Sequence, residues 1–328
     1  MSRAAVSDRL LARLISRLKM RHLLLLCRIE QYGSLTRVAE RMATSQPAVT
    51  HALAELEAMF GAPLFVRSAR GMAPTALGEV ALRRARAMLQ DLGHWVGDME
   101  AAAAGHAAHL HVGVIPFISG RLLAAAIGGA RSGGRPVTVT LHEGSSDHLL
   151  ARLRGHELDC VIGRLSAVLD LEGLAHEVLY EQEPRLVAHR RLAARLGRKA
   201  LAWADLAGLE WVLGQRNTPM REQINDFFLR AGAVPPLPVV ESLSAKLIGE
   251  LLGVNERAVS IVPADVAEEL ARSAGVGVVA HRFAWTLPPV TLFRRALPSG
   301  GEADERFAQA LRAACGLRVQ GAGGALAG

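Results

Sequence analysis

The segment from Gly33 to Glu57 constrains the fold more than any other part of the chain. Its apolar residues repeat at helical spacing in two short runs, separated by a polar turn around 43–45. Ser45 is a good N-cap for the second run, and Pro47 fits the first helical turn, where a backbone N–H has no helical partner. We therefore predict two short helices joined by a tight turn.

The second predicted helix has one apolar side and one side of small, hydrogen-bonding groups. The apolar side stacks Val49, Leu53, Leu56 and Phe60. The other side carries Gln46, Pro47, Thr50, His51 and Ala54. A solvated helix face more usually carries Lys and Glu, whereas a helix that enters the major groove of DNA needs short polar side chains at its amino end. The pattern predicts a helix-turn-helix that reads bases.

Residues 61–75 read as a strand, a turn and a returning strand. Arg67 and Arg70 fall near the tip of this small wing. Arginine beside a recognition helix suits contacts with phosphates or entry into the adjacent narrow groove.

The charge of the chain is concentrated at its amino end. Residues 1–70 hold 11 Lys and Arg against 5 Asp and Glu, whereas the rest of the chain holds 27 against 26. A basic end on a nearly neutral body is typical of a module that binds a polyanion and is attached to something else. The opening arginines, among them Arg3 and Arg17, fit an additional amphipathic first helix.

Several consecutive motifs in this region resemble the DNA-binding module of the LysR-type transcriptional regulators. They are Met20-Arg-His-Leu, Gly33-Ser-Leu-Thr-Arg-Val-Ala-Glu-Arg-Met, Ser45-Gln-Pro-Ala-Val, Leu53-Ala-Glu-Leu-Glu and Pro63-Leu-Phe-Val-Arg. They span about 18–79 in the family's order, and the opening helix is similar to the branch of galactose-binding-protein and protocatechuate-pathway regulators. The resemblance implies DNA-binding roles for Ser34, Thr36, Arg37, Ser45, Gln46, Pro47, Thr50, His51, Arg67 and Arg70. The family often has Arg at the position of His51, so the base preference there is open.

A long helix is predicted after the wing, from Thr75 to Ala104. Its apolar residues recur at alternating spacings of four and three: Ala81, Ala85, Met88, Leu92, Trp95 and Met99. This heptad seam favours pairing with a second helix, and an ordinary amphipathic helix packed on its own domain is the alternative. The family resemblance implies a homo-oligomer, either a dimer or a tetramer.

Strands and helices alternate in the remainder, which predicts an α/β region with a largely parallel sheet. Looser motifs here, such as Leu141-His-Glu-Gly and Arg164-Leu, also resemble the LysR family. The resemblance implies a two-lobed effector domain like the periplasmic binding proteins. We expect α/β architecture overall, with an all-α winged helix-turn-helix at 1–73, a dimerising linker helix at 74–105, an effector-binding domain at 106–318 and a flexible tail at 319–328. Lobe I is expected at about 106–164 and 265–318, and lobe II at about 165–264.

Three strand-to-helix turns, at 115–120, 143–146 and 214–218, suit a ligand between the lobes. Helix amino ends present unpaired N–H groups and a positive dipole, so converging ends favour an anionic effector. Each turn taken alone is better explained as a simple N-cap. The candidate effector-binding residues are Phe117, Ile118, Ser119, Ser145, Thr218 and Arg221.

An enzyme is not expected, because no GxSxG, Walker loop or HExxH motif occurs. No cofactor and no metal site are expected, since His106, His109 and His111 straddle a hinge and the start of a strand. Three scattered cysteines indicate a cytoplasmic protein with reduced thiols, and no apolar run suits a membrane span. The expected partners are an operator in double-stranded DNA, a small-molecule effector and, by resemblance, RNA polymerase. The alternative function is a small-molecule-binding α/β protein or enzyme whose helical amino end mediates association.

Overall fold

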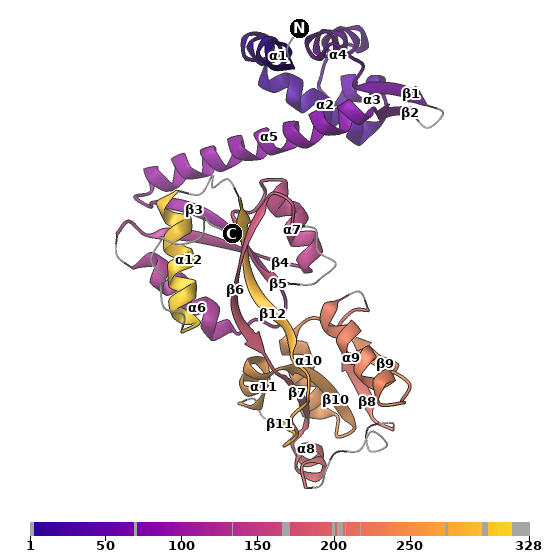
Figure 1. Ribbon diagram of the computed structural model, residues 1–328, viewed down its shortest axis with the longest axis vertical. Coiled ribbons are helices and arrows are strands. Elements are labelled where there is room, and N and C mark those ends of the chain that lie inside the picture. Colours follow the sequence, from indigo (N-terminus) through magenta and orange to yellow (C-terminus); the bar gives the residue numbers. More distant parts are fainter. Residues whose placement is uncertain are drawn as a thin grey trace. The chain divides into compact units, whose positions relative to one another are not determined.

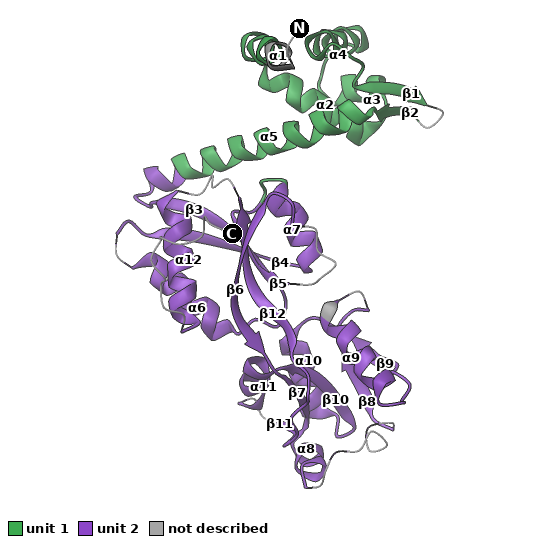
Figure 2. Ribbon diagram, in the orientation of Figure 1, with its two compact units in different colours: residues 1–99, 155–157 green, residues 100–154, 158–328 purple. Residues whose placement is uncertain are grey.

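The chain forms two compact units. The computed structural model describes residues 3–68, 71–132, 134–165, 171–198, 201, 206, 208–216, 218–272, 275–296 and 301–316 (Figure 1). Unit 1 comprises residues 1–99 with 155–157, and unit 2 comprises residues 100–154 with 158–328 (Figure 2). Arg70 and the expected tail at 319–328 lie outside the described residues.

Unit 1 contains the predicted helix-turn-helix and wing. Its elements are α1 (Arg3–Arg17), α2 (Met20–Tyr32), α3 (Leu35–Arg41), α4 (Gln46–Phe60), β1 (Phe65–Ser68), β2 (Gly71–Pro74) and, as far as Met99, the long helix α5 (Ala76–Ala103). Gly33 and Gly61 adopt left-handed backbone angles and end α2 and α4, a conformation that glycine adopts without steric cost. The inner face of α4 packs Val49, Leu53 and Leu56 against α2, α3 and the start of α5.

Helix α1 packs against the carboxyl end of α4. The guanidinium of Arg13 donates hydrogen bonds to the carbonyl oxygens of Ala58 (3.4 Å) and Met59 (3.2 Å). These carbonyls belong to the last turn of α4 and have no acceptor role within the helix, so a cation there also opposes the negative end of the helix dipole. The additional helix therefore supports the helix that carries the predicted DNA-binding side chains.

The heptad seam of α5 is divided between two environments. Ala81 and Ala85 are buried in the core of unit 1, whereas Met88, Trp95 and Met99 are exposed by 47%, 64% and 61%. The first two turns of the seam therefore pack on the helix-turn-helix itself, as in the alternative reading. The later turns leave an apolar stripe uncovered in unit 1.

Unit 2 contains two mixed five-stranded sheets. The first sheet, lobe I, has the order β4-β3-β5-β12-β6, and its strands are β3 (Ala108–Val114), β4 (Val137–Glu143), β5 (Cys160–Arg164), β6 (Leu174–Gln182) and β12 (Leu287–Arg295). Helices α6 (Gly120–Arg131) and α12 (Glu302–Ala314) cover one face, with Phe307 and Leu311 in the core between them and the sheet. Helix α7 (Ser146–Arg154) covers the other face.

The second sheet, lobe II, has the order β11-β7-β10-β8-β9. Its strands are β7 (Pro184–His189), β8 (Glu210–Leu213), β9 (Pro238–Glu241), β10 (Ala258–Pro263) and β11 (Val276–Val278). Its helices are α8 (Arg190–Leu196), α9 (Pro219–Arg230), α10 (Ala245–Val254) and α11 (Ala264–Ala271). The chain passes between the lobes twice, once from β6 to β7 and once from β11 to β12.

The lobe boundaries and sheet type differ from the sequence-based expectation. Residues 174–182 were expected in lobe II, yet β6 pairs antiparallel with β12 in lobe I. Residues 265–278 were expected in lobe I, yet α11 and β11 pack in the lobe II core. Both sheets are mixed, because the returning strands β12 and β7 run antiparallel to their neighbours. Pairing between strands that are far apart in the sequence leaves no local signature.

Candidate DNA interface and effector pocket

The exposed edge of α4 presents an ordered pair of polar side chains. Ser45 caps the helix by accepting a hydrogen bond from the N–H of Ala48 (3.4 Å). The amide Nε2 of Gln46 donates to the hydroxyl of Thr50 (2.9 Å), which donates to the carbonyl of Gln46 (3.0 Å). Both residues, like Pro47 and His51, are exposed. The helix therefore holds amide and hydroxyl groups free of the protein core at its amino end.

The remaining predicted DNA-binding residues lie on the neighbouring elements of unit 1. Ser34 is the residue before α3, and Thr36 and Arg37 are exposed in the first turn of that helix. Arg67 is exposed on the wing strand β1, which pairs with β2 through Arg67 and Met72.

A carboxylate on α4 anchors the wing, a contact that the sequence reading missed. Glu57 accepts hydrogen bonds from the backbone N–H groups of Leu64 (2.8 Å) and Phe65 (3.2 Å) at the start of β1. Because Glu57 lies on the same helix as Gln46 and Thr50, this contact fixes the wing relative to the exposed edge. The motif Leu53-Ala-Glu-Leu-Glu contains the residue but does not reveal its partners.

His22 lies buried beneath a surface cavity of about 310 Å³ in unit 1, lined in part by Arg21, His51 and Glu55. Its Nδ1 accepts a hydrogen bond from the N–H of Lys19 (3.3 Å), which satisfies a backbone donor at the amino end of α2. Burial lowers the pKa of His22, and the positive charges of Arg21 and Lys19 act in the same direction, against the Glu55 carboxylate 3.9 Å away. The neutral imidazole is therefore the form that the fold stabilises.

We expect unit 1 to lose stability as the pH falls below about 6.5, the usual pKa of histidine. The folded protein disfavours protonated His22, so the unfolded chain binds more protons at acidic pH. Proton binding therefore stabilises the unfolded chain relative to the folded protein as the pH falls. A protonated imidazole also cannot accept from Lys19, and a lost cap costs about 1 kcal/mol. Calorimetry at pH 8 and pH 5.5 measures the effect. His22→Gln, whose amide accepts at both pH values, should lose less stability than the wild type, and equal losses would contradict the role.

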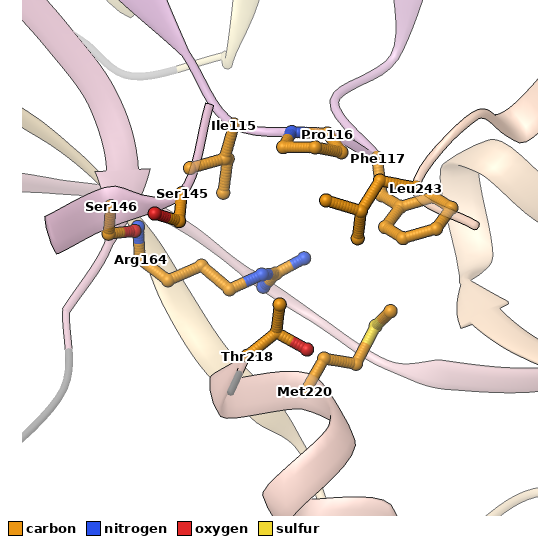
Figure 3. A pocket seen from close by; sticks show the side chains of 9 residues that line it. All are labelled: Ile115, Pro116, Phe117, Ser145, Ser146, Arg164, Thr218, Met220 and Leu243. Carbon is orange, nitrogen blue, oxygen red and sulfur yellow. The ribbon is translucent and has the colours of Figure 1, made fainter. Parts of the chain in front are cut away.

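A pocket lies between the two lobes of unit 2 (Figure 3). Its cavity volume is about 40 Å³, room for a few water molecules. Lobe I contributes the turn after β3, the start of α7 and the end of β5, whereas lobe II contributes the start of α9 and the residue Leu243. The lining residues are Ile115, Pro116, Phe117, Ser145, Ser146, Arg164, Thr218, Met220 and Leu243.

Arg164 is the charged residue among the described residues of this lining, and the sequence analysis did not name it as a candidate effector contact. Its side chain points into the pocket toward Thr218 and Phe117 (Figure 3), although the residue is only 4% exposed. The guanidinium donates to the carbonyl of Pro288 (2.7 Å) and to the amide oxygen of Gln182. Burial lowers the pKa of Arg164 to about 10, so the group stays charged at neutral pH.

Gln182 connects Arg164 to lobe II. Its Nε2 donates to both carboxylate oxygens of Asp265 at 2.9 Å, and Asp265 lies in the first turn of α11. Burial raises the pKa of the Asp265 carboxyl, although the hydrogen bonds from Val266 and Gln182 and the charge of Arg164 act against this shift.

Three of the six predicted effector residues line the pocket, and three lie elsewhere. Phe117, Ser145 and Thr218 are in the lining. Ile118 packs on the lobe I cores, and Ser119 caps α6 and donates to the carboxylate of Glu269 on α11. Arg221 lies in the first turn of α9 with its side chain buried, where it donates to the carbonyl of Gly214 (3.2 Å), and burial lowers its pKa. Of the three expected helix ends, those of α7 and α9 reach the pocket.

Phe117 joins the two lobes. It lies in the lobe I turn after β3, yet its ring is part of the hydrophobic core of lobe II and is 7% exposed. Its backbone is left-handed, with φ of 65°, a conformation that costs about 1–2 kcal/mol for a residue with a Cβ.

Comparison with known proteins identifies the family. Residues 20–79 match the bacterial regulatory helix-turn-helix proteins of the lysR family, and residues 103–316 match the LysR substrate binding domain. The chain belongs to the LysR family of transcriptional regulators. Among the relatives of this LysR-type regulator, GbpR of Azospirillum brasilense is 27% identical over 85% of this chain and 81% of its own length. PcaQ of Agrobacterium fabrum is 34% identical over 70% of this chain and 73% of its own.

Solved structures of LysR regulators share the fold of this LysR-type regulator. CbnR has a TM-score of 0.60 at 24% identity, covering 91% of this chain and 99% of that one. Full-length CbnR in complex with its target DNA gives the same TM-score at 24% identity, covering 90% of this chain and all of that one.

Membership decides between the two functions that the sequence left open. LysR-type proteins are ligand-responsive, DNA-binding transcriptional regulators, and this LysR-type protein is therefore a regulator and not an enzyme. Within the described residues, no group of three or more His, Cys, Asp or Glu side chains is arranged to hold a metal ion. None of the helices in the described part of the chain is both long and apolar enough to cross a membrane.

Proposed function

We propose that this regulator reads its operator through the exposed edge of α4, with Gln46, Thr50 and His51 contacting bases. Pro47 lies at the same base-reading edge, and supporting contacts with the DNA backbone come from the neighbouring residues Ser34, Thr36, Arg37, Ser45, Arg67 and Arg70. The observation that carries the proposal is the Gln46–Thr50 pair, two hydrogen-bonding side chains already ordered on the solvent side of α4. An ordered pair loses little side-chain entropy on binding, which favours direct readout of base edges.

The test is the operator preference of the full chain. We expect Thr50→Ala with His51→Ala to lower the ratio of operator to random-DNA affinity by about 10- to 100-fold, since a base contact contributes about 1–3 kcal/mol. The operator is first isolated by selecting genomic fragments that the wild-type protein binds, and affinities are measured by fluorescence anisotropy. An unchanged ratio in a folded double variant would refute base reading by α4.

Arg67→Ala is the matched control for that experiment. Arg67 is exposed on the wing and is assigned to a phosphate. Its loss should weaken binding to operator and random DNA alike. It should also reduce the slope of log affinity against log salt concentration by about one, the value for one lost phosphate contact. The two variants thus separate base contacts from charge.

The regulator acts as a homo-oligomer in this proposal, with the exposed stripe Met88, Trp95 and Met99 of α5 packing on a second copy. The stripe is an extension of a heptad pattern, and its exposed aromatic and methionine side chains suit a helix–helix interface. We assign DNA binding to residues 1–73, dimerisation to 74–105 and effector binding to 106–318, and both a dimer and a tetramer are compatible with this stripe.

The effector is an anion that binds in the interlobe pocket, near Phe117, Ser145 and Thr218. A buried guanidinium and the amino ends of α7 and α9 support this assignment, because all three favour negative charge. Binding alters the oligomer on its operator in the cytoplasm, and RNA polymerase is the partner through which this alters transcription.

A further inference from the structure

We infer that the interlobe pocket takes a small monocarboxylate with an apolar body, whose carboxylate binds Arg164. This inference rests on the proposed effector role of the pocket and names the chemical class that the site selects. It also gives Arg164 the central part in recognition, a residue that the sequence placed in a family motif but not among the candidate effector contacts.

The buried charge of Arg164 is the first argument. Its hydrogen-bond acceptors in the described structure, Gln182 and Pro288, are both neutral, and the nearest acidic partner in the chain of contacts, Asp265, is reached only through Gln182. A buried cation surrounded by neutral acceptors is stabilised when an anion pairs with it. A carboxylate suits this position because its two oxygens match the planar fork of a guanidinium.

The number of charges in the pocket sets the number of charges on the ligand. Arg164 is the one charged side chain among the nine described residues of the lining. A second carboxylate on the ligand would be buried without a counter-charge, at a cost of several kcal/mol. The pocket therefore favours a monoanion over a dianion.

The other walls define the body of the ligand. Five lining residues are apolar: Ile115, Pro116, Phe117, Met220 and Leu243. Two of the hydroxyls are already engaged within the protein, since Ser146 accepts from the N–H of Arg164 (3.1 Å) and Thr218 donates to the carbonyl of Gln215 (2.8 Å). A polyhydroxylated acid would bury several hydroxyl groups without partners, whereas an aromatic or branched aliphatic body would bury apolar surface.

The present volume means that binding must move the walls. A cavity of about 40 Å³ is far below the roughly 300 Å³ at the lower end of ligand pockets. Because the walls come from both lobes, and the Phe117 ring bridges them, admitting even a small acid requires the lobes or this ring to shift. Ligand binding is thereby coupled to the lobe arrangement, as a ligand-responsive regulator requires.

The experiment compares ligands on the unmodified full-length protein by isothermal titration calorimetry. The probes are benzoate and hexanoate, the neutral isostere benzamide, the dianion phthalate and the sugar acid gluconate. We expect saturable binding of a monocarboxylate, with benzamide, phthalate and gluconate at least about tenfold weaker, since hydrogen bonds to a charged group contribute about 1.5–3 kcal/mol. Equal binding of benzamide, preference for gluconate or phthalate, or no binding of either monocarboxylate overturns the inference.

Variants then assign the charge to Arg164. Arg164→Lys keeps the charge but loses the fork, so benzoate affinity should fall by about tenfold, and Arg164→Met should fall further. Arg295→Lys is the matched control, because Arg295 lies in the same sheet outside the pocket and donates to the carbonyls of Leu153 and Leu158. Undiminished binding in a folded Arg164→Met protein overturns the assignment. If that variant does not fold, the comparison of benzoate with benzamide on the wild type decides.

Operator binding of the same samples separates this inference from the proposed function. Selective binding to the operator depends on α4 and persists whatever the pocket takes. A response of operator binding to gluconate or phthalate, without one to benzoate or hexanoate, would leave the regulator as proposed and refute only the ligand class.

Discussion

Replacing Gly78 with alanine is expected to destabilise the DNA-binding unit by about 3 kcal/mol or more. Gly78 lies in the first turn of α5, and a Cβ there would stand 1.9 Å from the carbonyl oxygen of Leu64. That oxygen belongs to the backbone at the base of the wing, where it also accepts from the N–H of Thr75 (2.9 Å). No side-chain rotation relieves such an overlap, so α5 and the wing must move apart.

Gly93→Ala is the matched control, in the same helix. A Cβ at Gly93 meets no heavy atom within 4 Å, so the substitution should stabilise α5 by about 0.5–1 kcal/mol through helix propensity. Hydrogen exchange of peptides from α2 to α4, measured by mass spectrometry on the full chain, reports the stability of unit 1. We expect faster exchange and weaker operator binding for Gly78→Ala. Equal exchange in the two variants would mean that the close approach to Leu64 is not a constraint.

Phe117→Ala is expected to destabilise unit 2 by about 3–5 kcal/mol, the usual cost of removing a buried phenylalanine ring. The ring lies in the lobe II core while its backbone belongs to lobe I, so the variant also removes a link between the lobes. Calorimetric unfolding of the full chain measures the loss. A loss below about 1 kcal/mol would mean that the ring contributes little to either lobe.

Phe117→Gly adds a sharper test at the same site. Glycine in place of alanine ordinarily costs about 0.5–1 kcal/mol, but here the backbone is left-handed, and glycine alone adopts this conformation without strain. We therefore expect Phe117→Gly to be about 1 kcal/mol more stable than Phe117→Ala, the reverse of the usual order. The usual order would contradict the strain assigned to Phe117.

The helix-turn-helix could be predicted because its signals are local. The N-cap Ser45, the early Pro47 and the repeat of Val49, Leu53 and Leu56 lie within one short segment, and the structure forms α4 from Gln46 to Phe60. The start of α5 could be predicted for the same reason. The predicted N-cap Thr75 accepts a hydrogen bond from the N–H of Gly78 (3.0 Å).

The contacts that shape the two candidate sites could not be predicted from local sequence signals. Glu57 reaches the wing, and Arg13 reaches the end of α4 across 46 positions of sequence. In the sequence, Arg164 is simply the residue that follows a predicted strand. Its partners Gln182 and Pro288 come from distant segments that only the folded sheet brings beside it, so its place in the pocket could not be predicted. The same reason explains why β6 was assigned to the wrong lobe. Side chains within one turn of helix or one hairpin leave a periodic trace, whereas meetings between distant segments leave none.

Within the described residues, several side chains of unit 2 connect one lobe to the other. Phe117 in the lobe II core, the hydroxyl of Ser119 on the carboxylate of Glu269, and Gln182 on Asp265 each cross from one lobe to the other. A metabolite that binds with a Kd in the micromolar to millimolar range has a binding free energy of about 4–8 kcal/mol. This is comparable with the free energy contributed by a few such contacts between the lobes. The concentration at which the regulator responds can therefore be retuned by substitutions at these crossings, leaving operator choice untouched and letting sensitivity evolve separately from the set of genes controlled.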